Sequence, residues 1–93
     1  MLNRDKAERL PQRERNAMAL ATALVGSEVI LDDSAISGKV LVGTLTSVYV
    51  GGWPGEEWAA CNIAADDDNL IMGANATGVK PNLGGLPRGW AMA

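Results

Sequence analysis

Residues 38–81 read GKVLVGTLTSVYVGGWPGEEWAACNIAADDDNLIMGANATGVKP, and this stretch decides the fold. The glycine- and proline-rich segment 51–55 and the polar segment 66–69 are turn formers. Around these turns lie four runs of the residues that strands favour, namely 39–50, 56–65, 70–74 and 77–80. This succession of runs and tight turns is typical of a small antiparallel barrel or meander.

The residues before this stretch predict one more strand. Residues 27–32 (SEVILD) place Val29 and Leu31 on one face, as a short strand requires, and residues 33–38 form a loop rich in turn formers. Within the longest run, Gly43 predicts a bulge or a sharp bend, a device by which a sheet curls into a barrel.

The N-terminal part of the chain predicts an amphipathic helix over about residues 11–25, and whether residues 3–10 extend it stays open. Gly26 stands where a left-handed C-terminal cap is expected. We expect the helix either to cover an open end or edge of the barrel, or to dock on another subunit or a host protein. Its apolar residues recur at spacings of three and four: Ala17, Leu20, Ala21, Leu24 and Val25.

Over residues 27–81 the order of strands and turns resembles the SH3-like small barrel. The element GKVLVGTLTSVYV is similar to the strand pairs of KOW, Tudor and related modules. The resemblance implies aromatic ligand cages or basic loops, and this chain offers Tyr49, Trp53 and Trp58 but no basic loop. The expected fold is therefore mainly β, with an N-terminal helical segment (1–26), an SH3-like antiparallel barrel (27–81) and an extended C-terminal tail (82–93).

The tail, NLGGLPRGWAMA, is expected to lack regular structure, because its glycines and Pro87 preclude a helix or a central strand. It nevertheless carries Leu86, Trp90 and Met92, and a disordered tail is usually poorer in such residues. Three alternatives are open for Trp90: it folds back onto the barrel, docks on a neighbouring chain, or is free.

The charges are unevenly placed along the 93 residues, which carry a net charge of −3. Residues 1–15 hold five basic and three acidic residues, whereas residues 16–93 hold three basic and eight acidic ones. An acidic barrel argues against a wide nucleic-acid footprint, which requires clustered Lys and Arg. The single Cys61 and the absence of a secretory pattern or a long apolar run predict a soluble protein of the cytoplasm or a virion.

No pattern in the sequence indicates catalysis, a cofactor or a metal site. The chain has no His, which removes the commonest general base and most zinc sites. Cys61 lies within a predicted strand, where a small buried thiol is the usual outcome. The acids at 66–68 are expected to be a solvated hairpin tip, with an adventitious cation site as the alternative.

Tryptophan is enriched at binding hot spots, so Trp53, framed by glycine and proline, is the best candidate for contact with a partner, and packing within the core or the loop is the alternative. The sequence predicts a non-enzymatic protein–protein interaction or structural module, such as an assembly subunit of a phage or mobile element. The alternatives are a small inhibitor that presents its acidic barrel to a host protein and, with less support, a nucleic-acid-binding barrel that uses the basic N-terminal segment. The candidate contact residues are Tyr49, Trp53, Trp58, Leu86, Trp90, Met92, Arg13 and Arg15.

Overall fold

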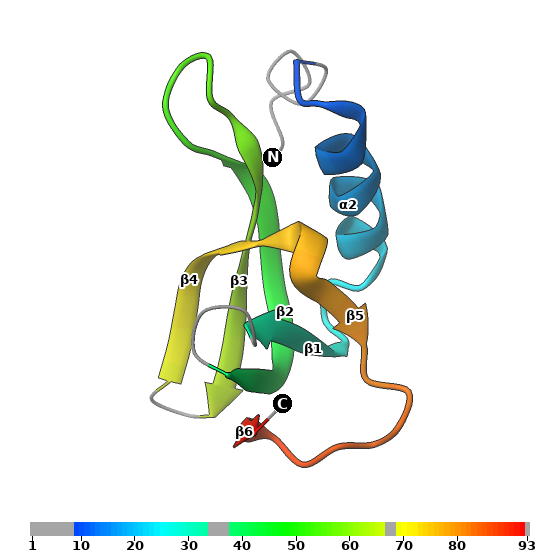
Figure 1. Ribbon diagram of the computed structural model, residues 1–93. Helices are drawn as coiled ribbons and strands as arrows, with labels where there is room; N and C mark the ends of the chain where they lie inside the picture. Colours follow the sequence, from blue (N-terminus) through cyan, green and yellow to red (C-terminus); the bar gives the residue numbers. More distant parts are fainter. Residues whose placement is uncertain (1–8, 34–37, 67–68, 93) are drawn as a thin grey trace.

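The computed structural model describes residues 9–33, 38–66 and 69–92 of the chain. Within them one α-helix precedes a set of antiparallel strands, so the fold is mainly β with an N-terminal helix, as predicted (Figure 1). In chain order the elements are α2 (Gln12–Ala23), β1 (Glu28–Asp33), β2 (Lys39–Gly51), β3 (Trp58–Asp66), β4 (Asn69–Asn75), the 3₁₀ turn η1 (Ala76–Gly78), β5 (Val79–Pro81) and β6 (Gly89–Met92).

The strands form one sheet in the order β4-β3-β2-β1-β5, and β6 adds to β2 outside this path. Every pairing is antiparallel. Among the described residues β4 and β5 lie at opposite ends of the order and form no ladder with each other, so the sheet is curled but does not close into a barrel.

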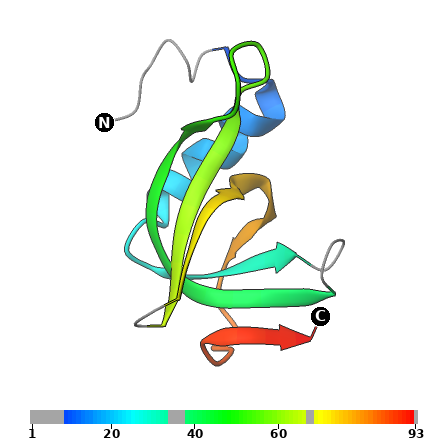
Figure 2. The ribbon, with the colours of Figure 1, turned by 90° about the vertical axis from the view of Figure 1, so that its left-hand side faces the viewer.

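The long strand β2 serves two parts of the sheet. Its N-terminal half pairs with β1 from Lys39 to Thr44, and its C-terminal half pairs with β3 from Thr44 to Gly51. Strand β6 pairs with the same N-terminal half, on the edge that β3 leaves at the bend. Figure 2 shows β2 turning sharply between these halves.

Gly43 lies at this bend, which confirms the predicted role of the residue. A Cβ atom at Gly43 would lie 2.6 Å from the Ala64 carbonyl oxygen and 2.9 Å from Ala65 Cα. Real Cβ contacts are not this short, so β3 can cross here only above a glycine. The register shifts shortly afterwards, between Leu45 and Ser47, which adds a bulge to the bend.

Helix α2 packs against the chain's own sheet, which is the first of the two alternatives for it. Met18 and Ala21 are buried, while Leu20 on the opposite face is exposed. The helix contacts η1, β2 and β3. Together these elements enclose a core made of Leu10, Met18, Ala21, Val29, Leu31, Leu41, Leu45, Ala59, Cys61, Ile63, Ala65 and Ala76.

The helix ends at Ala23, two residues before the predicted end, and Leu24 is its C-terminal cap. Gly26 has the expected positive φ, 89°, but lies in the turn that follows, in which the Ser27 N–H donates to the Leu24 carbonyl oxygen. The Gly26 N–H donates to the Leu45 carbonyl oxygen at 2.8 Å, and the Leu45 N–H donates to the Ser27 carbonyl oxygen at 3.0 Å. The glycine therefore turns the chain directly from the helix into β1 beside the centre of β2.

Two predictions about the C-terminal third are wrong. Residues 77–80 do not form a strand throughout, because the Asn75 side chain accepts from the Thr77 N–H at 2.9 Å and starts η1. The tail does not lack regular structure at Gly89–Met92, which pair with β2 as β6. A glycine-rich tail can supply an edge strand because the backbone of such a strand makes ladder hydrogen bonds along only one of its two sides.

Candidate functional site

The loop that joins β2 to β3, residues 52–57, is built on a tight turn over residues 53–56. The Glu56 N–H donates to the Trp53 carbonyl oxygen at 2.8 Å. Pro54 occupies the second position and Gly55, with φ of 87°, the third, as a type II turn requires. Residues 54 and 55 therefore fix the direction in which the chain leaves Trp53.

A second bond inside this loop holds the same turn. Glu57 Oε1 accepts from the Gly55 N–H at 3.1 Å, from just beyond the turn. Trp53 itself is 78% exposed at the tip. A large, exposed aromatic side chain thus stands on a loop that its own hydrogen bonds hold in shape, and such preorganisation lowers the entropic cost of binding.

Trp58 has a different role from Trp53, because it closes the base of the loop. Its ring lies so close to Gly52 that a Cβ at that position would be 2.6 Å from Trp58 Cδ1 and 2.5 Å from the Glu56 carbonyl oxygen. Gly52 also has φ of 96°, which side chains disfavour. Half-buried Trp58 therefore supports the loop, and of the two tryptophans Trp53 is the one presented to solvent.

A hollow of about 230 Å³ lies beside the turn. It brings one basic and one acidic residue next to the apolar surfaces of Val50 and Pro54. A partner that covers Trp53 would find both signs of charge close by. The lining residues are Arg9, Val50, Gly51, Gly52, Pro54 and Glu57.

Tyr49 does not join this loop but braces the far strand. Its hydroxyl donates to Asn62 Oδ1 at 2.8 Å, and the same oxygen accepts from the Gly73 N–H at 3.1 Å. Opposite Asn62, β4 contains an extra residue, since Cys61 pairs with Ala74 and Ile63 with Ile71. The hydroxyl of Tyr49 is therefore engaged in holding a bulge of β4.

The remaining sequence-predicted residues are divided between two ends of the molecule. Arg13 and Arg15 are exposed on α2, whose first turn lies at the same end as the β2–β3 loop (Figure 1). Leu86 is exposed in the segment between β5 and β6, which lies at the opposite end. The backbones of Trp90 and Met92 lie in β6, so the chain folds back onto the sheet there, whereas their side chains lie outside the described residues.

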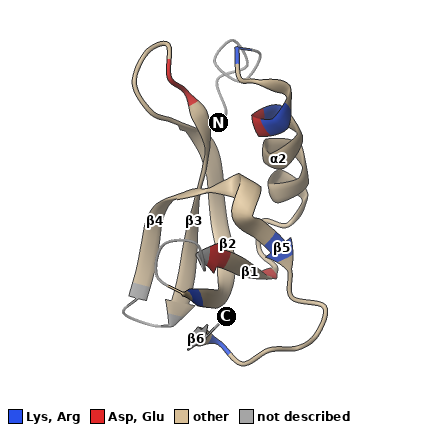
Figure 3. Ribbon diagram, in the orientation of Figure 1, with Lys and Arg blue, Asp and Glu red and all other residues tan. Residues whose placement is uncertain are grey.

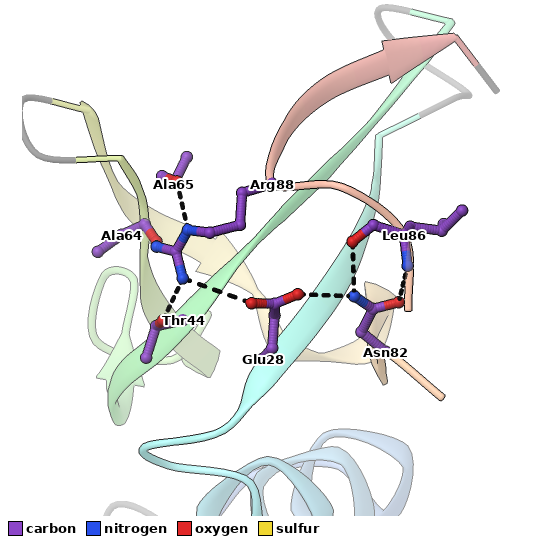
Figure 4. A network of polar contacts seen from close by, with 7 residues as sticks. All are labelled: Glu28, Thr44, Ala64, Ala65, Asn82, Leu86 and Arg88. Atoms are coloured by element: carbon purple, nitrogen blue, oxygen red, sulfur yellow. Dashed lines mark hydrogen bonds and ion pairs between the residues drawn. The ribbon is translucent and has the colours of Figure 1, made fainter. Parts of the chain in front are cut away.

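Arg88, which sequence reasoning counted only as a charge, ties the C-terminal segment to the sheet (Figure 4). Its guanidinium donates to the carbonyl oxygens of Ala65 (3.0 Å) and Ala64 (2.8 Å) and to Thr44 Oγ1 (2.8 Å). It also pairs with Glu28 Oε2 at 3.5 Å. Arg88 thus satisfies β3 carbonyls at the point where β3 leaves β2 and β6 begins.

Cys61 is fully buried, and its environment does not suit nucleophilic chemistry. Burial raises the pKa of the Cys61 thiol from 9.0 to about 11, so the thiol stays protonated at neutral pH. The described residues contain no group of three potential metal ligands. The candidate cation site at 66–68 lies partly outside the described residues, which omit 67 and 68.

In the part of the chain that the structure describes, no helix is both long and apolar enough to cross a membrane. Comparison with protein-family models, with curated proteins and with solved structures finds no match to this chain. The loop around Trp53 therefore stands as the candidate site on its own geometry.

Proposed function

We propose that this protein is a non-enzymatic protein–protein interaction module, a subunit of an assembly, and that the loop of residues 52–57 is its contact site. The observation that carries the proposal is Trp53, 78% exposed on a turn that hydrogen bonds and Pro54 hold in place. Tryptophan combines a large apolar area with few rotatable bonds, so its burial by a partner gives much binding energy for little lost entropy.

The position of the charges supports this proposal over its two alternatives. Figure 3 shows the described Lys and Arg residues distributed over several elements, and the described acids likewise. A nucleic-acid-binding surface needs clustered basic side chains, and an inhibitor of a basic host site needs a continuous acidic face. In the part of the chain that the structure describes, the basic residues of the N-terminal segment are Arg9, Arg13 and Arg15, and the other described charges lie on separate elements. On these residues a contact centred on an aromatic side chain has more support than the inhibitor or nucleic-acid functions.

We also propose that the curled sheet is an SH3-like small barrel with an open side. The five-strand antiparallel order and the sharp bend of β2 support this proposal. On any such scaffold the function resides in the loops, and here the loop between β2 and β3 carries the exposed aromatic residue.

The first experiment compares the self-association of the wild type, Trp53→Ala and Leu20→Ala. It uses size-exclusion chromatography with light scattering over a range of protein concentrations. If the partner is a second copy, Trp53→Ala weakens association by about 2 kcal/mol, roughly 30-fold in Kd. Leu20→Ala, which removes an apolar side chain that is 70% exposed on α2, leaves association unchanged. Equal effects of the two substitutions would contradict a contact at the loop.

If the wild-type chain is monomeric, a displayed random peptide library serves as the probe. Peptides are selected on the wild-type protein and then counter-selected on Trp53→Ala. Enriched peptides that bind the wild type and Leu20→Ala but not Trp53→Ala support the proposal. A monomer that enriches no Trp53-dependent peptide would overturn it.

A further inference from the structure

Strand β6 lies at the end of the molecule opposite the Trp53 loop, and it is held by a short seam. Its four residues pair with Lys39–Val42 of β2, with Val40 opposite Ala91 and Val42 opposite Gly89. Just before the strand, the Arg88 guanidinium bonds to the carbonyl oxygens of Ala64 and Ala65. All these partners belong to the body of the sheet, so a β6 from any copy of the chain could make the same bonds.

The segment that connects β5 to β6, residues 82–88, is what makes the pairing intramolecular. Asn82 closes it into a turn, because its Oδ1 accepts from the Leu86 N–H and its Nδ2 donates to the Leu86 carbonyl oxygen, both at 3.0 Å. Asn82 Nδ2 also donates to Glu28 Oε1 at 2.8 Å. One side chain therefore directs the segment back to its own sheet.

The same segment exposes apolar side chains that the described part of the chain leaves uncovered. Leu83 is 89% exposed, the largest value among the described large apolar residues, and Leu86 is 44% exposed. When two chains exchange a terminal strand, their connecting segments run side by side and form an interface that the monomer lacks. Leu83 and Leu86 lie where such an interface would form.

We propose that β6 is an exchangeable strand, and that two copies of this chain join when the β6 of each pairs with Lys39–Val42 of the other. Exchange keeps every hydrogen bond of the seam and of Arg88, now made to the second copy, and changes the course of residues 82–87. It adds burial of Leu83 and Leu86 against the second copy. The proposal does not depend on the Trp53 loop.

The balance between closed and exchanged forms follows from effective concentration. A short connecting segment gives the intramolecular strand an effective concentration on the order of 1 mM. Exchange therefore becomes substantial when copies are crowded to about that concentration, as in an assembly, or when the turn at Asn82 is weakened. The wild-type protein is expected to be mainly closed when dilute.

Two single-cysteine chains test this directly. In a Cys61→Ala background, one chain carries Val40→Cys and the other Ala91→Cys, and far-UV circular dichroism first checks that each is folded. Residues 40 and 91 face each other across the seam, and directly opposed residues of an antiparallel pair lie within disulfide range. After mixing at high concentration and mild oxidation, a covalent heterodimer forms where β6 of one chain pairs with β2 of the other.

The exchange hypothesis predicts more covalent heterodimer than random pairing of the two chains would give. The heterodimer yield should rise as the protein concentration approaches about 1 mM. Asn82→Ala should raise the yield further. An Ala19→Cys chain, with its cysteine exposed on α2, replaces the Val40→Cys chain to measure random collision. The same excess of heterodimer in a Trp53→Ala background would show that strand exchange does not depend on contact through the Trp53 loop. A statistical yield at every concentration, with and without Asn82→Ala, would overturn the proposal.

Discussion

Arg88 Nη2 donates a hydrogen bond of 2.8 Å to the carbonyl oxygen of Ala64, a residue 24 positions earlier in the chain. Ala64 pairs with Thr44 at the end of the β2–β3 ladder, where β2 bends away. A backbone carbonyl at such a point needs a donor from elsewhere. The guanidinium supplies donors to two carbonyls of β3 and thereby joins the C-terminal segment to the end of that strand.

Replacing Arg88 by Ala is expected to lower the free energy of unfolding. The guanidinium makes charge-assisted bonds but is 43% exposed, so we expect a loss of about 1 to 2 kcal/mol, or about 5 to 10 °C in Tm. Thermal unfolding followed by circular dichroism measures it. Lys80→Ala, which removes an exposed charge from β5, should change Tm little; equal shifts for both would show that charge alone matters.

Gly52 and Gly55 offer a matched pair, since both have positive φ but their surroundings differ. Gly55 has open space around it, so Gly55→Ala should cost about 1 kcal/mol of backbone strain. Gly52→Ala also drives a methyl group into Glu56 and Trp58 and should cost more than about 2 kcal/mol. Urea unfolding of the two variants decides this; a smaller loss for Gly52→Ala would mean that Trp58 does not close the loop.

The bond between Tyr49 and Asn62 can be measured by a double-mutant cycle. Tyr49→Phe removes one bond to Asn62 Oδ1 and should cost about 1 kcal/mol, whereas Asn62→Ala also leaves the Gly73 N–H without this acceptor and should cost about 2 kcal/mol. In the Asn62→Ala background, Tyr49→Phe should have almost no further effect. Full additivity of the two losses in urea unfolding would exclude the shared oxygen as a support for β4.

The raised pKa of Cys61 predicts a dependence of stability on alkaline pH. The folded protein holds the thiol proton up to about pH 11, whereas the unfolded chain releases it from its ordinary pKa of 9.0. The thiol's contribution is therefore fully present below pH 9 and is lost as the pH rises toward 11, by about 1.4 kcal/mol per unit. Urea unfolding at pH 7 to 11 should show a steeper decline for the wild type than for Cys61→Ala, and parallel curves would contradict a buried, protonated thiol.

Local patterns were enough to predict the helix, the succession of strands and the turn between β2 and β3. The helix showed its apolar spacing and its C-terminal Gly26, and the turn showed Pro54 and Gly55, residues that themselves determine backbone angles. The signals of the helix and of the turn act within a few residues, which is why the sequence alone reveals them. Gly43 also indicated the bend of β2, but the requirement for glycine there comes from Ala64 and Ala65, which approach it from another strand.

The features that sequence reasoning missed depend on residues far apart in the chain. Strand β6 forms because β2 has an unpaired edge at Lys39–Val42. The composition of residues 82–93 does not indicate that this edge exists. The bonds of Arg88 and Asn62 likewise require the sheet to be assembled first. The exposure of Trp53 followed from its glycine and proline frame, whereas the role of Trp58 did not, because Trp58 is covered by its approach to Gly52 in the folded loop.

The double use of β2 has a consequence for the order of events during synthesis. Strands β2, β3 and β4 are neighbours in sequence and can pair early, but Leu41 must wait for Trp90, about 50 residues later. Until residues 89–92 leave the ribosome, the edge of β2 at Lys39–Val42 has no β6 of its own, and an open edge accepts strands from other chains. Nascent chains on adjacent ribosomes of one messenger would therefore meet while that edge is still vacant.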